Sequence, residues 1–129
     1  MNLKLLAWDS EMISSVGMPS PYKNPILIIS LATESESKLL ILTDEEYAKK
    51  DDRRIIQEFI KYIYDNDFDC ILTYNGSMFD WPYIQKRAEL HGMALKLGRD
   101  GSEIRFSRSG LYETVDIIGR LNEIGRAHV

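Results

Sequence analysis

Residues 70–82 read CILTYNGSMFDWP, and this segment joins an expected strand to an expected helix. Its first four residues are apolar or β-branched, which favours a buried strand. The pair Asn75-Gly76 then favours a turn. Pro82 fits the first turn of a helix, which the following residues continue. Asp80 is therefore predicted to place a carboxylate at a junction of strand and helix.

Upstream of this segment, three apolar runs predict strands over residues 3–9, 25–31 and 38–42. The polar residues between the second and third runs favour a turn, so the three strands are expected to form an antiparallel meander. Apolar residues then recur at helical spacing over residues 52–64, which predicts a helix with one buried face. Because this helix precedes the run at 69–73, that fourth strand is expected to lie parallel to a neighbour.

Downstream, a second helix is predicted over residues 81–91, with Gly92 as its C-terminal stop. Residues 98–103 are typical of a turn and residues 104–106 of a short strand, whereas the tail over residues 112–129 carries no clear pattern. This order of elements predicts an α/β fold with a central mixed sheet flanked by helices.

The whole chain, residues 1–129, has the length and composition of one globular domain, with 44% hydrophobic and 28% charged residues. Cys70 is the one cysteine, so no disulfide can form within the chain, which fits a reducing compartment. The N-terminus lacks a signal-peptide pattern, and no apolar run approaches the roughly 20 residues of a membrane helix. We expect a cytoplasmic protein without a membrane partner.

The net charge of −4 argues against a protein that coats nucleic acid, yet the charge is unevenly distributed. Residues 1–80 carry 8 Lys and Arg against 14 Asp and Glu, whereas residues 81–129 carry 8 against 6. Metal ions held by carboxylates would mask part of the acidic excess. The arginines of the second part could face a phosphate backbone or form a solvated surface; they are Arg87, Arg99, Arg105, Arg108, Arg120 and Arg126.

Three acidic residues stand at the predicted ends of two separate elements. Asp9 and Glu11 are two residues apart in a strand, so their side chains project to the same face, about 6–7 Å apart at the backbone. Oxygen ligands of this kind suit Mg²⁺ or Mn²⁺. Asp80 lies near the start of a helix, whose dipole favours the ionised form, although a simple N-capping role is equally open. Asn75 can belong to an ordinary turn, and Phe79 to the core.

Asp9-x-Glu11, followed by the segment from Tyr74 to Tyr83, resembles the first two motifs of the 3′–5′ proofreading exonuclease domain of family-B DNA polymerases, most closely of archaeal members. The resemblance continues through KRAE at residues 86–89, LGRDGSE at 97–103 and GRAHV at 125–129, in the family's order. It implies the ribonuclease-H-like α/β fold of this exonuclease family, with a central mixed sheet.

The resemblance also implies a role for each matching residue. Asp9 would bridge two Mg²⁺ or Mn²⁺ ions, and Glu11 would complete the shell of the ion that carries the attacking water. Asp80 would hold the second ion, which stabilises the departing 3′-hydroxyl. Asn75 would hydrogen-bond the terminal nucleotide, and Phe79 would pack against the unpaired 3′ bases. The implied partners are the single-stranded 3′ end of DNA and the remainder of a polymerase chain.

The family's third motif, Tyr-x-x-x-Asp on a later helix, has no convincing counterpart in the sequence. Tyr112 and Asp116 fit the pattern literally, but they precede the element at residues 125–129, whereas the family's motif follows it. We therefore expect a β-hairpin or loop at residues 112–116. Only eight residues precede Asp9, and no polymerase palm motif is present, so the chain resembles a fragment of a larger polymerase, truncated before the third motif.

Several functions remain open at this point. The first is an exonuclease domain that hydrolyses 3′-terminal phosphodiesters of DNA with two metal ions, which the presence of Asp9, Glu11 and Asp80 favours. The second is a catalytically silent domain that binds nucleic acid or supports the polymerase, which the missing third motif favours. A nuclease of the same fold acting on RNA is a third. We expect the isolated chain to be weakly active or inactive.

Overall fold

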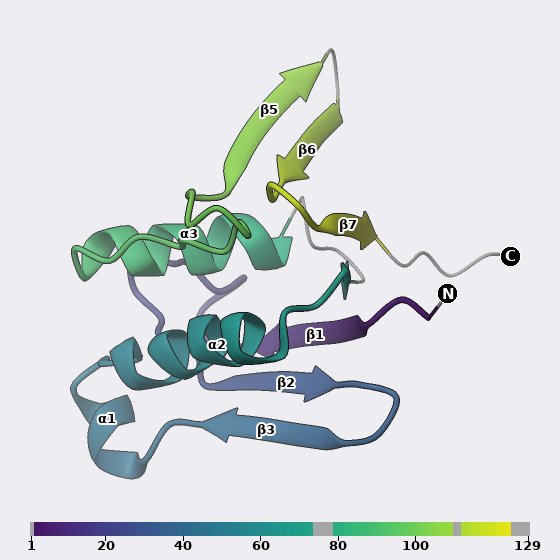
Figure 1. Cartoon of the computed structure of the whole chain (residues 1–129). Coiled ribbons are helices and arrows are strands. Elements are labelled where there is room, and N and C mark those ends of the chain that lie inside the picture. Colours follow the sequence, from purple (N-terminus) through teal and green to yellow (C-terminus); the bar gives the residue numbers. More distant parts are fainter. Residues whose placement is uncertain (1, 74–78, 110–111, 125–129) are drawn as a thin grey trace, which may run out of the picture.

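The computed structural model describes residues 2–73, 79–109 and 112–124, and these residues form a five-stranded mixed sheet, a separate two-stranded hairpin and three α-helices (Figure 1). The sheet has the strand order β3-β2-β1-β4-β7. Its strands are β1 (Leu5–Glu11), β2 (Ile28–Ala32), β3 (Ser37–Ile41), β4 (Cys70–Thr73) and β7 (Leu121–Ile124).

The first three strands form the predicted antiparallel meander. β1 pairs with β2 and β2 with β3, both antiparallel, and Asp9 of β1 lies opposite Ser30 of β2. The predicted start of the second strand was three residues early. Pro25 has no N–H to give to a strand ladder, and regular pairing begins only at Ile28.

β4 pairs parallel to β1 on one side and parallel to β7 on the other, which confirms the prediction of a parallel fourth strand. The carboxyl ends of β1, β4 and β7 therefore point toward the same edge of the sheet. The last parallel pair joins Ala7 to Leu72, and β1 continues to Glu11. Asp9 and Glu11 thus lie in the part of β1 that continues past its pairing with β4, close to the edge where the segment after Thr73 leaves the sheet.

Two helices cover one face of the sheet, as seen in Figure 1. α2 (Arg53–Asn66) buries one stripe of apolar residues at helical spacing, which agrees with the predicted amphipathic helix: Ile55, Ile56, Phe59 and Ile63. α3 (Trp81–Leu90) has Pro82 in its first turn, and Gly92 adopts a left-handed backbone with φ +69° just after its end. The short helix α1 (Asp44–Ala48), closed by a capping box between Thr43 and Glu46, was not predicted.

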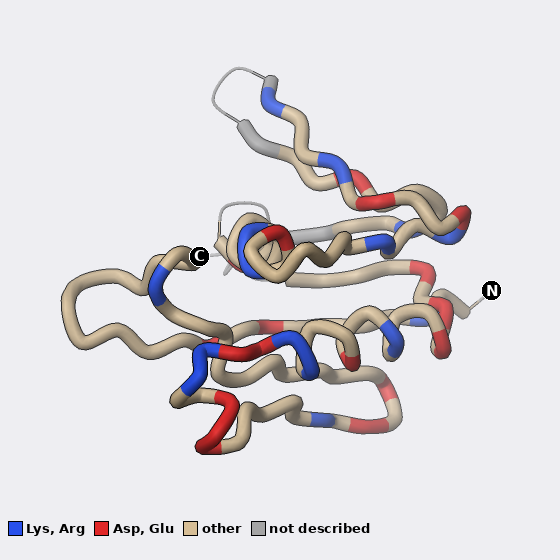
Figure 2. The backbone as a smooth tube through the Cα atoms, turned by 90° about the vertical axis from the view of Figure 1, so that its left-hand side faces the viewer, with Lys and Arg blue, Asp and Glu red and all other residues tan. Residues whose placement is uncertain are grey.

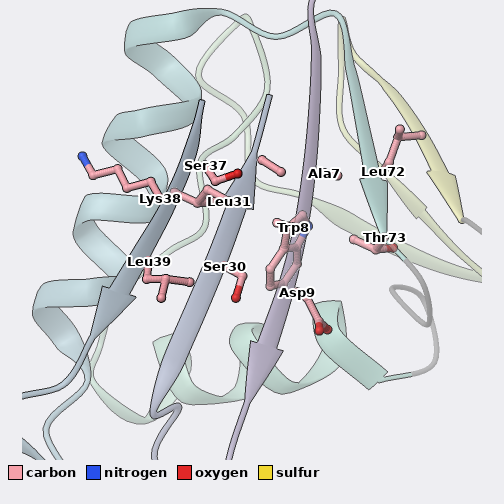
Figure 3. A pocket seen from close by; sticks show the side chains of 11 residues that line it. Ala7, Trp8, Asp9, Ser30, Leu31, Ser37, Lys38, Leu39, Leu72 and Thr73 are labelled. Carbon is pink, nitrogen blue, oxygen red and sulfur yellow. The ribbon is translucent and has the colours of Figure 1, made fainter. Parts of the chain in front are cut away.

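The opposite face of the sheet carries no helix among the described residues. Burial along β1 alternates accordingly: Leu6, Trp8 and Ser10 are buried under the helices, whereas Ala7, Asp9 and Glu11 are exposed. The open face is hollowed by a cavity of about 580 Å³ (Figure 3), lined by residues of β1 to β4 that include Ala7, Asp9, Ser30, Leu39 and Leu72.

A separate hairpin stands away from the sheet (Figure 1). It consists of β5 (Arg105–Ser109) and β6 (Tyr112–Asp116), which pair antiparallel. The short strand predicted at residues 104–106 and the hairpin expected at 112–116 are thereby confirmed, while β7 was not predicted. In the parts of the chain that the structure describes, no helix combines the length and the apolar character needed to cross a membrane.

Candidate functional site

Asp9 and Glu11 lie at the carboxyl end of β1 on the open face of the sheet, as their spacing predicts. Figure 3 shows Asp9 at one end of the cavity on this face, with Ser30 and Thr73 from the neighbouring strands. The hydroxyl of Thr73 is buried and has no hydrogen-bond partner among the described residues. The oxygens that this end of the cavity offers to a cation or a hydrogen-bonding ligand are therefore those of Asp9 and Ser30, which lie opposite each other on the open face.

Asp80 immediately precedes α3, but it does not cap the helix. Its backbone is already helical, with φ −62° and ψ −48°, and its side chain makes no capping hydrogen bond. The carboxylate is instead buried, with 3% of the residue exposed, and its Oδ1 accepts a hydrogen bond of 2.5 Å from Ser10 Oγ. The N-capping interpretation is therefore wrong, and this carboxylate is directed toward β1.

The residues next to the acids hold the two elements together. Trp8, which precedes Asp9, packs edge-on against Trp81, which follows Asp80, with ring centroids 4.7 Å apart. Phe59 of α2 packs against both rings, at 4.7 Å from Trp8 and 6.1 Å from Trp81. Because all three rings are buried, this contact fixes the end of β1 against the start of α3.

The electrostatic environment of Asp80 is unfavourable for its negative charge. Burial is the main cause that raises the pKa of the Asp80 carboxyl, and the charge of Asp9 raises it further, while hydrogen bonding from Ser10 acts in the opposite direction. Among the residues that the structure describes, no Lys, Arg or His forms an ion pair with Asp80, Asp9 or Glu11. Within residues 2–73, 79–109 and 112–124, no basic side chain therefore compensates the negative charge of these acids.

The three acids supply suitable donors for a divalent cation, but they do not form a finished metal cage. Within the described ranges, no three His, Cys, Asp or Glu side chains converge into a group that could hold an ion. Asp9 and Glu11 face the open side of β1, whereas Asp80 contacts Ser10, whose side chain points to the helix-covered side. Mg²⁺ and Mn²⁺ keep waters and take substrate oxygens, so an open, oxygen-only site fits their chemistry.

The resemblance assigns two residues to the nucleotide, and the structure describes one of them, Phe79. Phe79 is half-buried at the edge of the core, and its ring lies 5.6 Å from that of Tyr83. Its position beside Asp80 leaves part of the ring exposed. Asn75 lies outside the described residues, as does the rest of the segment from Tyr74 to Met78.

The six arginines of the second part of the chain do not form one surface. Arg87 and Arg120 are buried, so both the phosphate-facing and the solvated interpretation are wrong for these two. Arg99 donates to Asp67 and Asp69 and to the carbonyl of Gly119. This arginine thereby ties the LGRDGSE run to the start of β4 and to the turn before β7, which gives that run a structural role.

The remaining arginines are those of the hairpin and of the C-terminal residues. Arg105 and Arg108 of β5 are exposed and form no ion pair with any described residue. Figure 2 shows basic residues on this hairpin, apart from the sheet. Arg126 lies outside the described residues.

Tyr112 and Asp116 belong to strand β6 and not to a helix. Four residues along a strand cover about 13 Å, whereas one helical turn would bring a tyrosine and an aspartate of this spacing together. In the register of the hairpin, Asp116 lies opposite Arg105, and Asp116 is exposed. The described structure therefore gives no support to these two residues as a third motif.

Two features of the site region escaped prediction. Ser10, between the two acids of β1, contacts Asp80, and a serine in that position carries no sequence signal of its own. Asp52, Arg87 and His91 form a buried polar cluster that links α2 to α3. Asp52 and Arg87 are 35 positions apart, so no local sequence pattern indicates this pairing, which depends on the packing of the two helices.

Comparison with known proteins supports the resemblance. Residues 1–122 match the family model described as the exonuclease domain of DNA polymerase family B. A DNA polymerase of Archaeoglobus fulgidus is 45% identical over 120 residues, which cover 93% of this chain and 14% of that protein. A DNA polymerase of Pyrococcus glycovorans is 43% identical over 124 residues, which cover 93% of this chain and 16% of that protein.

A solved structure shows the same architecture. The family B DNA polymerase from the hyperthermophilic archaeon Pyrobaculum calidifontis superposes with a TM-score of 0.83 at 30% identity, over 95% of this chain and 15% of that one. The chain thus spans about one seventh of the length of these relatives. With the family model covering residues 1–122 and with this fold, the chain belongs to the exonuclease domain family of family B DNA polymerases.

Proposed function

We propose that residues 1–129 act as one exonuclease-like domain of a DNA polymerase, in which Asp9, Glu11 and Asp80 hold Mg²⁺ or Mn²⁺ for hydrolysis of 3′-terminal phosphodiesters of DNA. The observation that carries the proposal is the state of Asp80. Its carboxylate is buried close enough to Asp9 to be affected by its charge, it does not cap its helix, and no described basic residue pairs with it.

A buried carboxylate without a basic partner is costly unless something compensates its charge. Proteins pair such groups, protonate them or use them to coordinate metals. One neutral hydroxyl, that of Ser10, is the only side-chain hydrogen bond to Asp80 among the described residues. The positive charge of a divalent cation near Asp80 and Asp9 would offset both causes that raise the pKa of Asp80, burial of its charge and repulsion by Asp9.

The chain's own residues would divide the work of the reaction. Asp9 and Glu11 project into the open side of the sheet and would hold a cation where a substrate can approach. Asp80 would add a third carboxylate from the start of α3. When bound, the metal would supply hydroxide near neutral pH and neutralise charge on the phosphate oxygens. Phe79 would stack against an unpaired 3′ base, with Asn75 as the hydrogen-bonding partner of the terminal nucleotide.

The proposed partners are the single-stranded 3′ end of DNA and the remainder of a polymerase chain. The similarity of the chain to about one seventh of several archaeal DNA polymerases supports both. We propose a cytoplasmic location, because the similar polymerases are archaeal and the DNA of archaea lies in the cytoplasm.

A catalytically silent, DNA-binding or structural domain is the second candidate. The observation that favours it is the absence of a group of three metal-ligating side chains within the described residues. The position of Asp116 on the hairpin strand β6 removes one candidate for an additional carboxylate. A silent domain and a metal-dependent one differ in a measurable property, which is affinity for Mn²⁺ at this site.

Isothermal titration calorimetry with Mn²⁺ tests the proposal. We expect the native chain to bind Mn²⁺ and Asp9→Ala to bind it at least about 10-fold more weakly, because a ligand is lost. Asp44→Ala serves as the matched control, since Asp44 is an exposed acid in α1 and should leave the affinity unchanged. Equal affinity of native protein and Asp9→Ala would refute a metal site at Asp9 and favour the silent domain.

A further inference from the structure

Ser10 occupies an unusual position in β1. The inward-facing residues of this strand are Leu6, Trp8 and Ser10, and the first two belong to the hydrophobic core. Ser10 is buried as well, with 8% of the residue exposed. A hydroxyl under two helices is unfavourable unless it is hydrogen-bonded, so an apolar residue would be the ordinary choice for this position.

The contact that accounts for this hydroxyl is the one with Asp80. Ser10 Oγ donates to Asp80 Oδ1 at 2.5 Å, across 70 residues of sequence. The rings of Trp8 and Trp81 fix the end of β1 against the start of α3. Because Asp80 does not cap α3, Ser10 supplies the contacts that direct its carboxylate among the described residues, chiefly through its hydroxyl and to a smaller extent through its backbone N–H.

We propose that Ser10 is a positioning residue for the metal site, and this inference rests on the proposed function. Its hydroxyl orients the carboxylate of Asp80 at the end of the strand that carries Asp9 and Glu11. Carboxylates that bind metals are themselves held by hydrogen bonds, and loss of such a partner weakens metal affinity by about 10- to 100-fold. Ser10 thereby connects the two motifs. Its neighbours in β1 are Asp9 and Glu11, the proposed metal ligands of the first motif, and its hydroxyl hydrogen-bonds Asp80, the acid of the second.

Three variants test this role. Ser10→Ala removes the hydroxyl, Ser10→Thr retains it, and Ser102→Ala removes a buried hydroxyl that lies beside Asp100, outside the site. By calorimetry, we expect Ser10→Ala to bind Mn²⁺ at least about 10-fold more weakly than the native chain. Ser10→Thr should recover most of that loss, and Ser102→Ala should bind like the native chain. Thermal unfolding of each variant identifies any that fail to fold. If Ser10→Ala is one of them, Ser10→Val replaces it, because valine has the shape of threonine without the hydroxyl and should lose the Mn²⁺ affinity that Ser10→Thr keeps.

A metal-free measurement separates this inference from the proposed function. In protein labelled with ¹³C, the side-chain carboxyl resonance of Asp80 should move in Ser10→Ala and stay in place in Ser102→Ala. If Asp9→Ala abolishes Mn²⁺ binding while Ser10→Ala binds like the native chain, the metal site stands and the role of Ser10 is refuted. If the native chain binds no Mn²⁺, the proposed function fails. An Asp80 resonance that is the same in native protein and Ser10→Ala overturns the orienting hydrogen bond whatever the metal result.

Discussion

At the scale of single residues, two buried aspartates, Asp52 and Asp80, differ in the partners of their carboxylates. Asp52 is fully buried and accepts hydrogen bonds from Arg87 Nε and Nη2, both at 2.9 Å, and from the backbone N–H of Ile26 at 2.8 Å. His91 Nε2 lies 2.6 Å from Asp52 Oδ1, the oxygen that also accepts from Arg87 Nη2. Asp80 is nearly as buried but receives one side-chain hydroxyl. The carboxylate paired with an arginine is structural, whereas the one without a basic partner among the described residues is suited to an external cation.

The structural role of Asp52 leads to a prediction about stability. Arg87→Leu should lower the free energy of unfolding by about 3–5 kcal/mol, because it leaves the charge of Asp52 buried without its main partner. It also removes the hydrogen bonds from Arg87 to the carbonyls of Pro21 and Lys50. Urea unfolding followed by circular dichroism measures the loss.

Arg53→Leu is the matched control for Arg87→Leu. Arg53 also forms a close ion pair, with Asp51, but that pair is on the surface, where water screens it. We expect Arg53→Leu to shift the urea midpoint far less than Arg87→Leu. Equal shifts for the two variants would show that burial of the Asp52–Arg87 pair has no particular importance.

At the scale of elements, the sequence was sufficient wherever a strand or helix was long and periodic. The meander, α2, β4 and α3 follow from apolar spacing and from the turn and helix-end residues around them. α1 has five residues, none of them buried, and so carries no apolar pattern; its capping box is the only local signal. β7 has four residues, and its place beside β4 depends on tertiary packing. The contact of Ser10 with Asp80 also depends on tertiary packing and could not be predicted, since no local pattern encodes a hydrogen bond across 70 residues.

The docking of α3 predicts a dependence on high pH. Tyr83 of α3 donates its hydroxyl to the carbonyl of Asn24, and burial, the main cause, raises the pKa of the Tyr83 phenol to about 12. The folded pKa lies above the ordinary value of 10.0, so this group's contribution to stability is fully present below pH 10. The contribution is lost as the pH rises through about 12, because the ionised phenol cannot donate.

Absorbance at 295 nm follows tyrosine ionisation and tests this dependence. The difference between native protein and Tyr83→Phe should be a single phenol that titrates near pH 12. The loss of stability between pH 10 and pH 12 should be smaller in Tyr83→Phe, although Tyr62, whose pKa is also raised to about 12, ionises in the same range. A difference spectrum that titrates near pH 10 would contradict the buried, hydrogen-bonded state of Tyr83.

At the scale of the whole molecule, the described structure is a sheet with helices on one side only. Parallel strands such as β1, β4 and β7 are normally covered on both faces. Here the uncovered face exposes large apolar residues, among them Leu39 (58%), Ile41 (47%) and Leu121 (55%). Asp9 and Glu11 lie on the same face and are therefore open to water, where charge interactions are strongly screened. A metal site in this setting lacks the dry surroundings that make electrostatic catalysis effective.

The last prediction follows from this openness. The isolated 129-residue chain should degrade single-stranded DNA very slowly or not at all, because its three carboxylates are not gathered into one group and the described residues offer no fourth. Loss of one ligand or of its hydrogen-bonding support costs about 10- to 100-fold, and a nucleophile misplaced by about 1 Å can cost about 100-fold more. The assay follows release from a 3′-labelled oligonucleotide with Mg²⁺ or Mn²⁺, beside the double variant Asp9→Ala/Glu11→Ala. Rapid 3′–5′ digestion that disappears in the double variant would show that the site is complete as it stands. Asp116→Asn would then establish whether the hairpin strand β6 supplies the additional carboxylate.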